Sequence, residues 1–503
     1  MGKKHKRSEE NKIRTKAFPR WMTLGLLALI LAGYAAASAY KIDEPFIHFT
    51  DDVSGPNGIA AENLGAHGPI ALKFGFFTNW ISDPSNPGSA YTHHPSLFLI
   101  PTAIVYKIFG ISETTTRLGL FLLMFASLAI FFFALKKITG NARFSLLSIL
   151  FFVLLPGTVY YGKSFELTVF AVPAALITFS LFAFFRFEER ETRRRTYFWL
   201  FLASIPIGAQ MAWFFYFLPV GIWIFLLTKH GRDVPNRSPL LFLIPVLLAL
   251  SFGVTMLQFF LLNGPSFFSD FMASFQNRTQ AQPFGGWVSR MWWITDLNIT
   301  WLFFLAGISG FLAWTARIKK DARLAFLLPV MIFPFFVLVI FRQWSTHPFG
   351  VIPFLPLIAL GSAILIDRIA EHSKPWGLLA ACGIIAFGGY LSSQRIQTFY
   401  NELFILGGKD VALAREIGSQ VGDYDVCLGT NPAGLGVEGI IQWYMRKNIA
   451  VSPQCSEKNP KIILAFHPSM GAVAEKEIKD AEEGGYAFLG CADLLCVLEK
   501  ANN

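Results

Sequence analysis

The chain has 503 residues, of which 53% are hydrophobic, 16% are aromatic and only 15% are charged. Soluble proteins carry about 25% charged residues, so this composition excludes a soluble globular protein and makes the membrane the main solvent. The net charge of +10 comes from Lys and Arg grouped between apolar runs. Such grouping reports membrane topology and contact with membrane lipids, and it argues against nucleic acid as a partner.

Residues 1–20 form a basic tail, and the apolar run 21–40 follows directly. Small residues at 35–39 resemble a cleavage site, which makes a removed signal peptide the alternative interpretation. The run is about 20 residues long, beyond the roughly 7–15 of a signal-peptide core. We therefore expect a retained helix with the N-terminus in the cytoplasm.

Further apolar runs alternate with basic connections. We expect membrane helices near residues 118–135, 144–158, 167–185, 196–210, 212–228, 239–262, 299–316, 324–341, 350–366 and 375–391. With the first run, the sequence predicts an α-helical polytopic membrane protein of about eleven transmembrane helices. The positive-inside rule assigns the basic connections to the cytoplasm.

That rule decides two ambiguous segments. Residues 196–227 have basic flanks on both sides, so an even number of crossings is needed, and we expect two short helices that turn near 207–209. The segment 96–109 is apolar enough for a crossing, but counting it as one would move Lys136 and Lys137 outside. We therefore predict an interfacial or re-entrant helix there, within one long outer loop at 41–117.

The composition changes after the last apolar run. Residues 392–503 are predicted to form a small extracytoplasmic α/β domain, with helices near 410–421 and 472–483 and strands near 425–429, 461–466 and 486–489. Four of the five cysteines lie in this domain. Two disulfides are possible in an oxidising compartment, three connectivities remain open, and Cys491 with Cys496 is our choice.

The outer loop 41–117 gathers the residues that carry chemistry. Asp51 and Asp52 follow the first helix, and a carboxylate shielded by apolar neighbours can act as a general base. The alternative is an acidic pair that is simply solvated. His93, His94 and Arg117 follow in the same loop.

The order of motifs in this loop resembles a known family. Asp51-Asp52 is followed by Ile59-Ala60-Ala61-Glu62, then His93-His94-Pro95, then Phe109-Gly110-Ile111-Ser112-Glu113 and Arg117. This order is similar to that of the polyprenyl-phosphate-dependent glycosyltransferases of the GT-C class, in particular the protein O-mannosyltransferases and lipid A aminoarabinose transferases. The resemblance covers about 70 residues and implies a GT-C-like transmembrane domain at 21–391.

The resemblance also implies an activity. The protein would transfer a sugar from a dolichyl- or undecaprenyl-phosphate-linked donor to an acceptor hydroxyl on a lipid, a protein or a glycan, with inversion. It would do so on the outer side of a membrane, which we expect to be a bacterial inner membrane. Aligning Ile59 to Glu62 with the family brings Asp52, rather than Asp51, onto the catalytic aspartate, and Asp51 becomes a supporting neighbour.

The histidines depart from the family pattern. His94 stands where the family has Arg or Lys before proline, and His93 stands where some members have glutamate. A neutral histidine supplies no fixed charge to a phosphate. The two histidines could support catalysis or bind a divalent metal, which is the only cofactor that we consider.

Later outer segments supply further candidates. Lys163 and Glu166 match a basic and an acidic position of the family, although a local ion pair is the alternative. The family's loop over the donor lipid supplies a basic residue, for which we choose Arg278. Arg342 and His347 lie between two helices on the same side, and arginine suits a phosphate through its forked donors. The resemblance thus implies a donor-phosphate site of Arg117, Lys163, Arg278, Arg342 and His347.

Two other classes of function remain as alternatives. A transporter or flippase for lipid-linked sugars is compatible with the number of helices and the short paired helices at 196–228. Such proteins hold ionisable residues near the middle of the bilayer, whereas here they gather at outer helix ends. A non-catalytic envelope assembly protein is the third interpretation.

Overall fold

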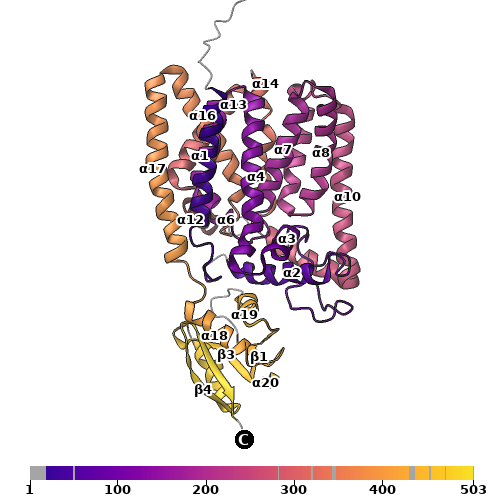
Figure 1. Cartoon of the computed structure of the whole chain (residues 1–503), viewed down its shortest axis with the longest axis vertical. Coiled ribbons are helices and arrows are strands. Elements are labelled where there is room, and N and C mark those ends of the chain that lie inside the picture. Colours follow the sequence, from indigo (N-terminus) through magenta and orange to yellow (C-terminus); the bar gives the residue numbers. More distant parts are fainter. Residues whose placement is uncertain are drawn as a thin grey trace, which may run out of the picture.

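The computed structural model describes residues 19–48, 51–280, 283–318, 321–342, 347–429, 437–452, 455–470 and 472–501. Most of the basic tail predicted at 1–20 lies outside the described residues, so its predicted place in the cytoplasm concerns a segment without a described structure. Figure 1 shows two parts along the long axis: a bundle of helices and, beyond one end of the bundle, a smaller domain of helices and strands at the C-terminus.

The bundle has a core of long apolar helices. Among the described residues, six helices are long and apolar enough to span a membrane, and a pair bent by 97° raises this number to seven. Four further helices pack between them, so that the bundle has the eleven helices that the apolar runs predicted. They are α1 (Arg20–Ala39), α4 (Glu113–Thr139), α5 (Ala142–Leu154), α7 (Ala171–Phe187), α8 (Glu191–Ala209), α9 (Phe217–Leu227), α10 (Arg237–Asn263), α13 (Trp301–Arg317), α15 (Leu328–Ile340), α16 (Leu355–His372) and α17 (Lys374–Asn401).

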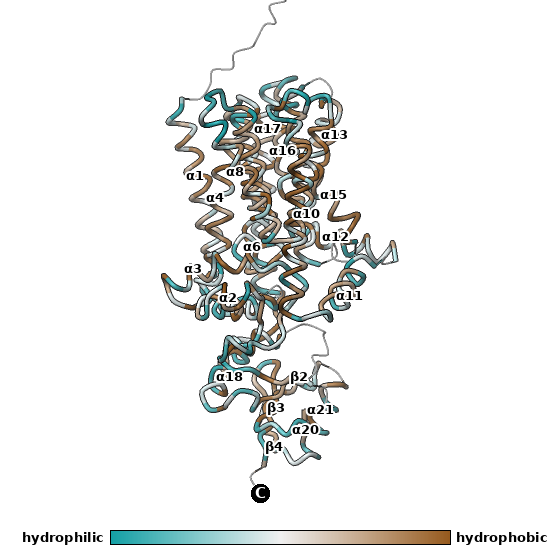
Figure 2. Tube along the Cα trace, turned by 90° about the vertical axis from the view of Figure 1, so that its right-hand side faces the viewer, coloured by the Kyte–Doolittle hydropathy of each residue, from teal (hydrophilic) through white to brown (hydrophobic). Residues whose placement is uncertain are grey.

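Hydropathy follows this architecture. Figure 2 shows apolar residues along the middle of the bundle and more polar residues at its two ends and over the C-terminal domain. The basic connection that holds α14 (Ala322–Ala325) and the turn from α16 to α17 both lie at the end away from the C-terminal domain (Figure 1). This arrangement agrees with the parity of crossings that the basic connections predicted. The protein is therefore an integral membrane protein.

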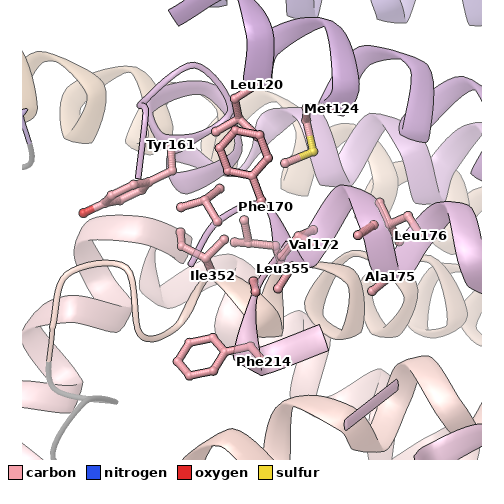
Figure 3. Packing of buried hydrophobic residues seen from close by; sticks show 14 of the residues in the cluster. Leu120, Met124, Tyr161, Phe170, Val172, Ala175, Leu176, Phe214, Ile352 and Leu355 are labelled. Carbon is pink, nitrogen blue, oxygen red and sulfur yellow. The ribbon is translucent and has the colours of Figure 1, made fainter. Parts of the chain in front are cut away.

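Close packing holds the bundle together, since apolar burial alone drives little association between helices in lipid. Helices α13 and α16 approach through Gly307, Gly310 and Gly361, and a Cβ atom on Gly310 would meet the carbonyl oxygen of Gly361. Elsewhere in the bundle core, side chains of α4, α7 and α16 interdigitate around buried Phe170 (Figure 3). Close approach at glycines and interdigitation of larger side chains thus determine which helices are in contact.

A layer of short helices covers the end of the bundle that faces the C-terminal domain (Figure 1). Helix α3 (Leu99–Phe109) has 11 residues and spans about 16 Å, too little to cross a hydrocarbon core of about 30 Å. This agrees with the interfacial helix predicted at 96–109. The remaining short elements at this end are η1 (Asp51–Val53), α2 (Ser54–His67), α6 (Pro156–Tyr161), η2 (Trp213–Tyr216), η4 (Gly264–Ser266), α11 (Phe267–Thr279), α12 (Phe284–Ile299) and η6 (Ile352–Phe354). At the opposite end, η3 (Lys229–Gly231) follows α9.

Two predicted helix boundaries differ from the structure. The run 144–158 breaks into α5 and α6, because Pro156 cannot continue the first helix and begins the second. The last bundle helix continues to Asn401 instead of ending at 391, so the C-terminal domain begins later than 392. The prediction ended the helix at 391 because polar residues follow the apolar run there. The helix nevertheless continues, and Arg395 in the added turns forms an ion pair with Asp296 of α12 that supports them.

The C-terminal domain contains one mixed sheet. Its strands are β1 (Val426–Leu428), β2 (Ala450–Val451), β3 (Ile462–Phe466), β4 (Tyr486–Cys491) and β5 (Leu495–Lys500), and its helical elements are α18 (Gly408–Gly418), α19 (Glu438–Met445), α20 (Cys455–Lys458), η7 (Pro468–Met470) and α21 (Ala472–Glu483). The strand order is β2-β1-β3-β5-β4, with β2, β1 and β3 parallel and β5 antiparallel to both β3 and β4.

Two disulfides stabilise this domain. Cys491 pairs with Cys496, as we expected, and Cys427 pairs with Cys455. The first bond joins neighbouring antiparallel strands, whereas the second fastens α20 to β1. Such bonds persist in an oxidising compartment.

Candidate active site

The acidic pair predicted as the catalytic centre lies in η1, at the end of the bundle that faces the C-terminal domain. Asp51 is buried, and one of its carboxylate oxygens accepts hydrogen bonds from the backbone N–H of His48 at 3.2 Å and from Arg117 Nη2 at 3.4 Å. Its other oxygen accepts a hydrogen bond from the hydroxyl of Ser54 at 3.4 Å. Asp51 is therefore an anchor of the loop and is occupied by internal partners.

Asp52 has a different environment. Burial raises the pKa of its carboxyl to about 7, and the negative charges of Asp51 and Glu438 add to this effect. Hydrogen bonds from the backbone N–H groups of η1 oppose the rise. A carboxyl with a pKa near neutrality can accept a proton and release it again under physiological conditions. The structure thus gives the two aspartates different tasks.

Arg117 also serves the loop itself. Its Nη1 atom donates hydrogen bonds to the carbonyl oxygens of Ile42 at 2.8 Å and Glu44 at 2.5 Å, and its guanidinium lies 4.9 Å from the ring centre of Phe46. The side chain is buried and paired with Asp51. These contacts do not favour the predicted contact with a donor phosphate, because the guanidinium is already used to hold the segment after α1.

The motif Phe109 to Glu113 places this arginine. Gly110 has φ of 79° and ends α3 in a conformation that other residues rarely adopt. The hydroxyl of Ser112 then accepts a hydrogen bond from the backbone N–H of Thr115 and caps α4. The motif is therefore a turn between two helices, and it sets Arg117 in the first turns of α4.

Lys163 and Glu166 follow α6 and have separate partners. Lys163 donates a hydrogen bond to the carbonyl oxygen of Tyr40, and its ammonium lies 5.0 Å from the ring centre of Tyr400. Burial, together with the charge of Arg117, lowers the pKa of Lys163 to about 7. Among the described side chains it forms no ion pair with Glu166, so the local pair considered from the sequence is absent from this part of the structure.

Glu166 belongs to the same site as Asp52. Its Oε1 atom accepts hydrogen bonds from the backbone N–H and the hydroxyl of Thr168 at 3.1 and 3.0 Å, whereas Oε2 is buried without a hydrogen bond. Burial raises the pKa of Glu166 to about 8, the charge of Asp52 adds to the rise, and Arg278 opposes it. Asn57 of α2 donates a hydrogen bond to the carbonyl oxygen of Phe165 at 2.6 Å, which joins the two segments.

The two histidines lie in a loop fixed by Trp213. The indole N–H of Trp213 donates a hydrogen bond to the carbonyl oxygen of His93 at 2.8 Å. Burial and the charge of Arg278 lower the pKa of both His93 and His94, so both rings are neutral at neutral pH. No group of three or more His, Cys, Asp or Glu side chains in the described ranges could hold a metal, and a divalent metal stays a prediction.

A cavity of about 880 Å³ opens next to the histidines. It lies between the loop from Gly88 to His93 and helix α11, and Tyr91 and Arg278 contribute to opposite walls. Tyr91 and Arg278 share a hydrogen bond, and Arg278 interacts electrostatically with Glu166. Arg278 in the wall of this cavity thus lies near Glu166, which in turn interacts with Asp52.

A cationic group extends from this cavity onto α12. The pKa of His347 is lowered to about 4 by desolvation and by the charges of Arg290 and Arg278. The guanidinium of Arg342 lies 5.7 Å from the ring centre of Trp287. Trp287 lies on α12, about one turn before Arg290. The structure places Arg278 and Arg290 near His347, and Arg342 against Trp287 of α12; Arg290 was not among the residues chosen from the sequence.

An apolar groove lies against the same helix. Its volume is about 250 Å³, and its lining from α12, α13, α15, η6 and α16 is almost wholly apolar. Trp292 of α12 is 58% exposed, and Phe284 is 69% exposed. Exposed aromatic residues of this kind are typical of a helix at the membrane interface.

The site also includes a residue from the C-terminal domain. Helix α19 packs against α2 and η1, and its first residue, Glu438, interacts electrostatically with Asp52. Nothing in the sequence links these positions, which are separated by nearly the whole chain. Only the folded structure brings them together.

Comparisons with known proteins agree with this geometry. Residues 93–259 match the family model described as dolichyl-phosphate-mannose-protein mannosyltransferase. No curated protein matches the sequence.

Solved structures match nearly the whole fold. The crystal structure of ArnT from Cupriavidus metallidurans bound to undecaprenyl phosphate is 13% identical and superposes with a TM-score of 0.68, covering 95% of this chain and 98% of ArnT. The oligosaccharyltransferase of Archaeoglobus fulgidus is 10% identical with a TM-score of 0.63, covering 95% of this chain and 74% of that one. The mycobacterial arabinofuranosyltransferase AftD is 12% identical with a TM-score of 0.55, covering 97% of this chain and 40% of AftD.

The resemblance inferred from the outer-loop motifs is thereby confirmed. The match to ArnT includes the outer-loop helices and the C-terminal domain, because it covers almost all of both chains. This integral membrane protein has the fold seen in ArnT, in the archaeal oligosaccharyltransferase and in AftD, and its residues 93–259 match the mannosyltransferase family model.

Proposed function

We propose that this protein transfers a sugar from a polyprenyl-phosphate donor to an acceptor hydroxyl, with Asp52 as the general base. The observation that carries the proposal is the interaction of Glu166 both with Asp52 and with Arg278, which lines the cavity. The mannosyltransferase-family match and the lipid phosphate named for the ArnT structure support the class of donor.

The proposed reaction is a direct displacement. The acceptor oxygen forms a bond to the anomeric carbon as the bond from that carbon to the phosphate oxygen breaks. Asp52 takes the proton of the acceptor hydroxyl, and the electron pair of the broken bond leaves with the polyprenyl phosphate. Because attack and departure occur on opposite faces, the configuration of the sugar inverts without a covalent enzyme intermediate.

The cations of the site have a matching task. Negative charge develops on the leaving phosphate, and fixed cations stabilise it best where water is excluded. The charges of Arg278 and Arg290 both lower the pKa of His347, so both arginines lie near this ring. We assign the donor phosphate to this cluster, together with Arg342, and not to Arg117 or Lys163, whose partners hold the loop after α1.

The lipid tail of the donor needs an apolar surface that leads to these cations. The groove along α12 supplies such a surface, and Arg290 and Arg342 lie on the same helix or against it. Membrane lipids would fill the groove when no donor is bound. The acceptor, whether lipid, protein or glycan, would approach Asp52 from the side of the C-terminal domain.

The proposed orientation places the C-terminal domain outside a bacterial inner membrane and the N-terminus in the cytoplasm. Two disulfides in the domain and basic connections at the opposite end of the bundle support it. Cysteines introduced at 140, 235 and 440 into a variant that lacks Cys382 test it. The docked domain is first denatured so that position 440 becomes accessible. An impermeant reagent added outside the sealed vesicles should then label only position 440.

Turnover tests the reaction itself. Purified protein is mixed with radiolabelled polyprenyl-phosphate sugars and membrane extract as acceptor, and release of sugar from the donor is measured. We expect Asp52→Asn to lower turnover by about 10²–10⁴-fold, the usual contribution of a general base. Asp83→Asn is the matched control, because Asp83 lies exposed in the same outer loop. Full turnover by Asp52→Asn would exclude the assigned base, and absence of transfer from every donor by the wild type would exclude the reaction.

A further inference from the structure

The C-terminal domain is docked against the proposed active site through helix α19. Gly439 of α19 and Gly55 of α2 meet at backbone distance, since a Cβ atom on Gly55 would lie 2.6 Å from the carbonyl oxygen of Gly439. On the next turns, the ring of Trp443 lies against Gly58. Two helices from opposite ends of the chain thus pack without side chains between them at this point.

Polar contacts reinforce the same seat. The backbone N–H of Phe46 donates a hydrogen bond to the hydroxyl of Tyr444 at 2.7 Å. Arg446 pairs with Glu62 of α2 at 2.5 Å, and its guanidinium lies 4.9 Å from the ring centre of Trp80. These contacts all fall within one short helix, so they fix both the position and the rotation of α19.

This docking determines where Glu438 lies. Glu438 is the residue directly before Gly439, and Asp52 lies three residues before Gly55. The glycine contact therefore holds the beginning of α19 beside η1, and the carboxylates of Glu438 and Asp52 interact. Glu438 itself is exposed to solvent.

We propose that Glu438 is a positioning residue of the active site, supplied by the C-terminal domain, which acts on the reaction through Asp52. The proposal rests on the proposed role of Asp52 as the base. Glu438 does not need to touch the substrate, because a like charge nearby disfavours the ionised form of a carboxyl and makes it a stronger base. Docking of the domain would thus give the base its full strength.

The charges around Asp52 come from three segments. Asp51 is its neighbour in η1 and is paired with Arg117, Glu166 approaches from the loop after α6, and Glu438 approaches from α19. Asp51 and Glu438 raise the pKa of Asp52, and of these three carboxylates only Glu438 is solvent-exposed and belongs to another domain. It can therefore be changed without leaving a buried cavity.

The test is the pH dependence of transfer by the full-length protein. In Glu438→Gln, the midpoint of the acid limb should move to lower pH by about 0.5 unit, since one exposed negative charge near Asp52 is removed. Glu438→Asp should restore the wild-type midpoint, because it keeps the charge. Glu482→Gln, on the exposed side of α21 in the same domain, is the control and should leave the profile unchanged.

Each outcome has one meaning. An unchanged midpoint in Glu438→Gln with wild-type turnover overturns the proposal. Equal loss of turnover in Glu438→Gln and Glu438→Asp, with the midpoint unmoved, also overturns it, because residue 438 would then serve only the fold of the domain. Absence of transfer by the wild type would count against the proposed function, and a normal wild-type profile with no shift in the variant would count against this proposal alone.

Discussion

Replacing Gly55 by alanine should loosen the C-terminal domain from the proposed active site. The added Cβ atom would lie 2.6 Å from the carbonyl oxygen of Gly439 and 2.8 Å from the Cα atom of Ile440, and both are backbone atoms. Ordinary contact begins near 3.4 Å, so α19 must withdraw by roughly 0.8 Å. Overpacking of this kind costs about 1–3 kcal/mol, which corresponds to a roughly 5- to 150-fold larger population of undocked α19.

The measurement is amide hydrogen exchange of α19 in the purified protein, with turnover measured on the same samples. Gly65→Ala is the matched control, because it lies in the same helix α2 and its nearest neighbour would be the carbonyl oxygen of Ala103 at 3.8 Å. Removing a glycine from a helix without a clash stabilises by about 0.5–1 kcal/mol. Faster exchange of α19 only in Gly55→Ala is expected, and equal exchange in the two variants would refute the close packing of these helices.

Three further expectations concern the site and the domain. Transfer should rise about tenfold per pH unit up to pH about 7 and then level off, because Asp52 with a pKa of about 7 is active only when deprotonated; a rate that is flat between pH 5 and 8 would contradict this. Arg278→Ala should lower kcat by about 10²–10³-fold. Arg278→Lys should recover part of this loss, since lysine keeps the positive charge but lacks the forked donors of arginine. Both variants are measured by steady-state kinetics, and a normal kcat in the alanine variant together with an inactive lysine variant would exclude the assignment. Replacing Cys427 and Cys455 together by serine should cost the domain about 3–4 kcal/mol, because the bond closes a separation of 28 residues, and an unchanged unfolding temperature of the domain would contradict it.

The sequence predicted the membrane architecture well because its physical signals are local. Most bundle helices coincide with an apolar run of the sequence, and the basic connections fix the parity of crossings without any knowledge of contacts. The same logic assigned 96–109 to the outer end, where α3 lies (Figure 1). Local rules failed where polar residues continue a helix through tertiary contacts, as in the last turns of α17, where Arg395 reaches Asp296.

In the candidate site, the sequence identified most of the residue types but not their tasks. Asp51 and Asp52 are adjacent and chemically identical, so only partners distinguish them: Asp51 binds Arg117, and Asp52 is left with a raised pKa. The motif that suggested a phosphate ligand at Arg117 proved to be a helix turn that positions this arginine against the loop. A family-like spacing therefore does not reveal whether a cation faces a substrate or the protein itself.

By itself, then, the sequence determined that this is a polytopic membrane protein with an acidic loop after its first helix and a small C-terminal domain, because hydropathy, charge and motif order are written along the chain. Tertiary structure alone decided that Glu438 of the C-terminal domain lies near Asp52 and that Arg278 lies near Glu166. These residues come from segments far apart in the chain, and their proximity results from close backbone packing, as at Gly55 and Gly439. Such contacts depend on the shapes of both partners, which no single stretch of sequence contains.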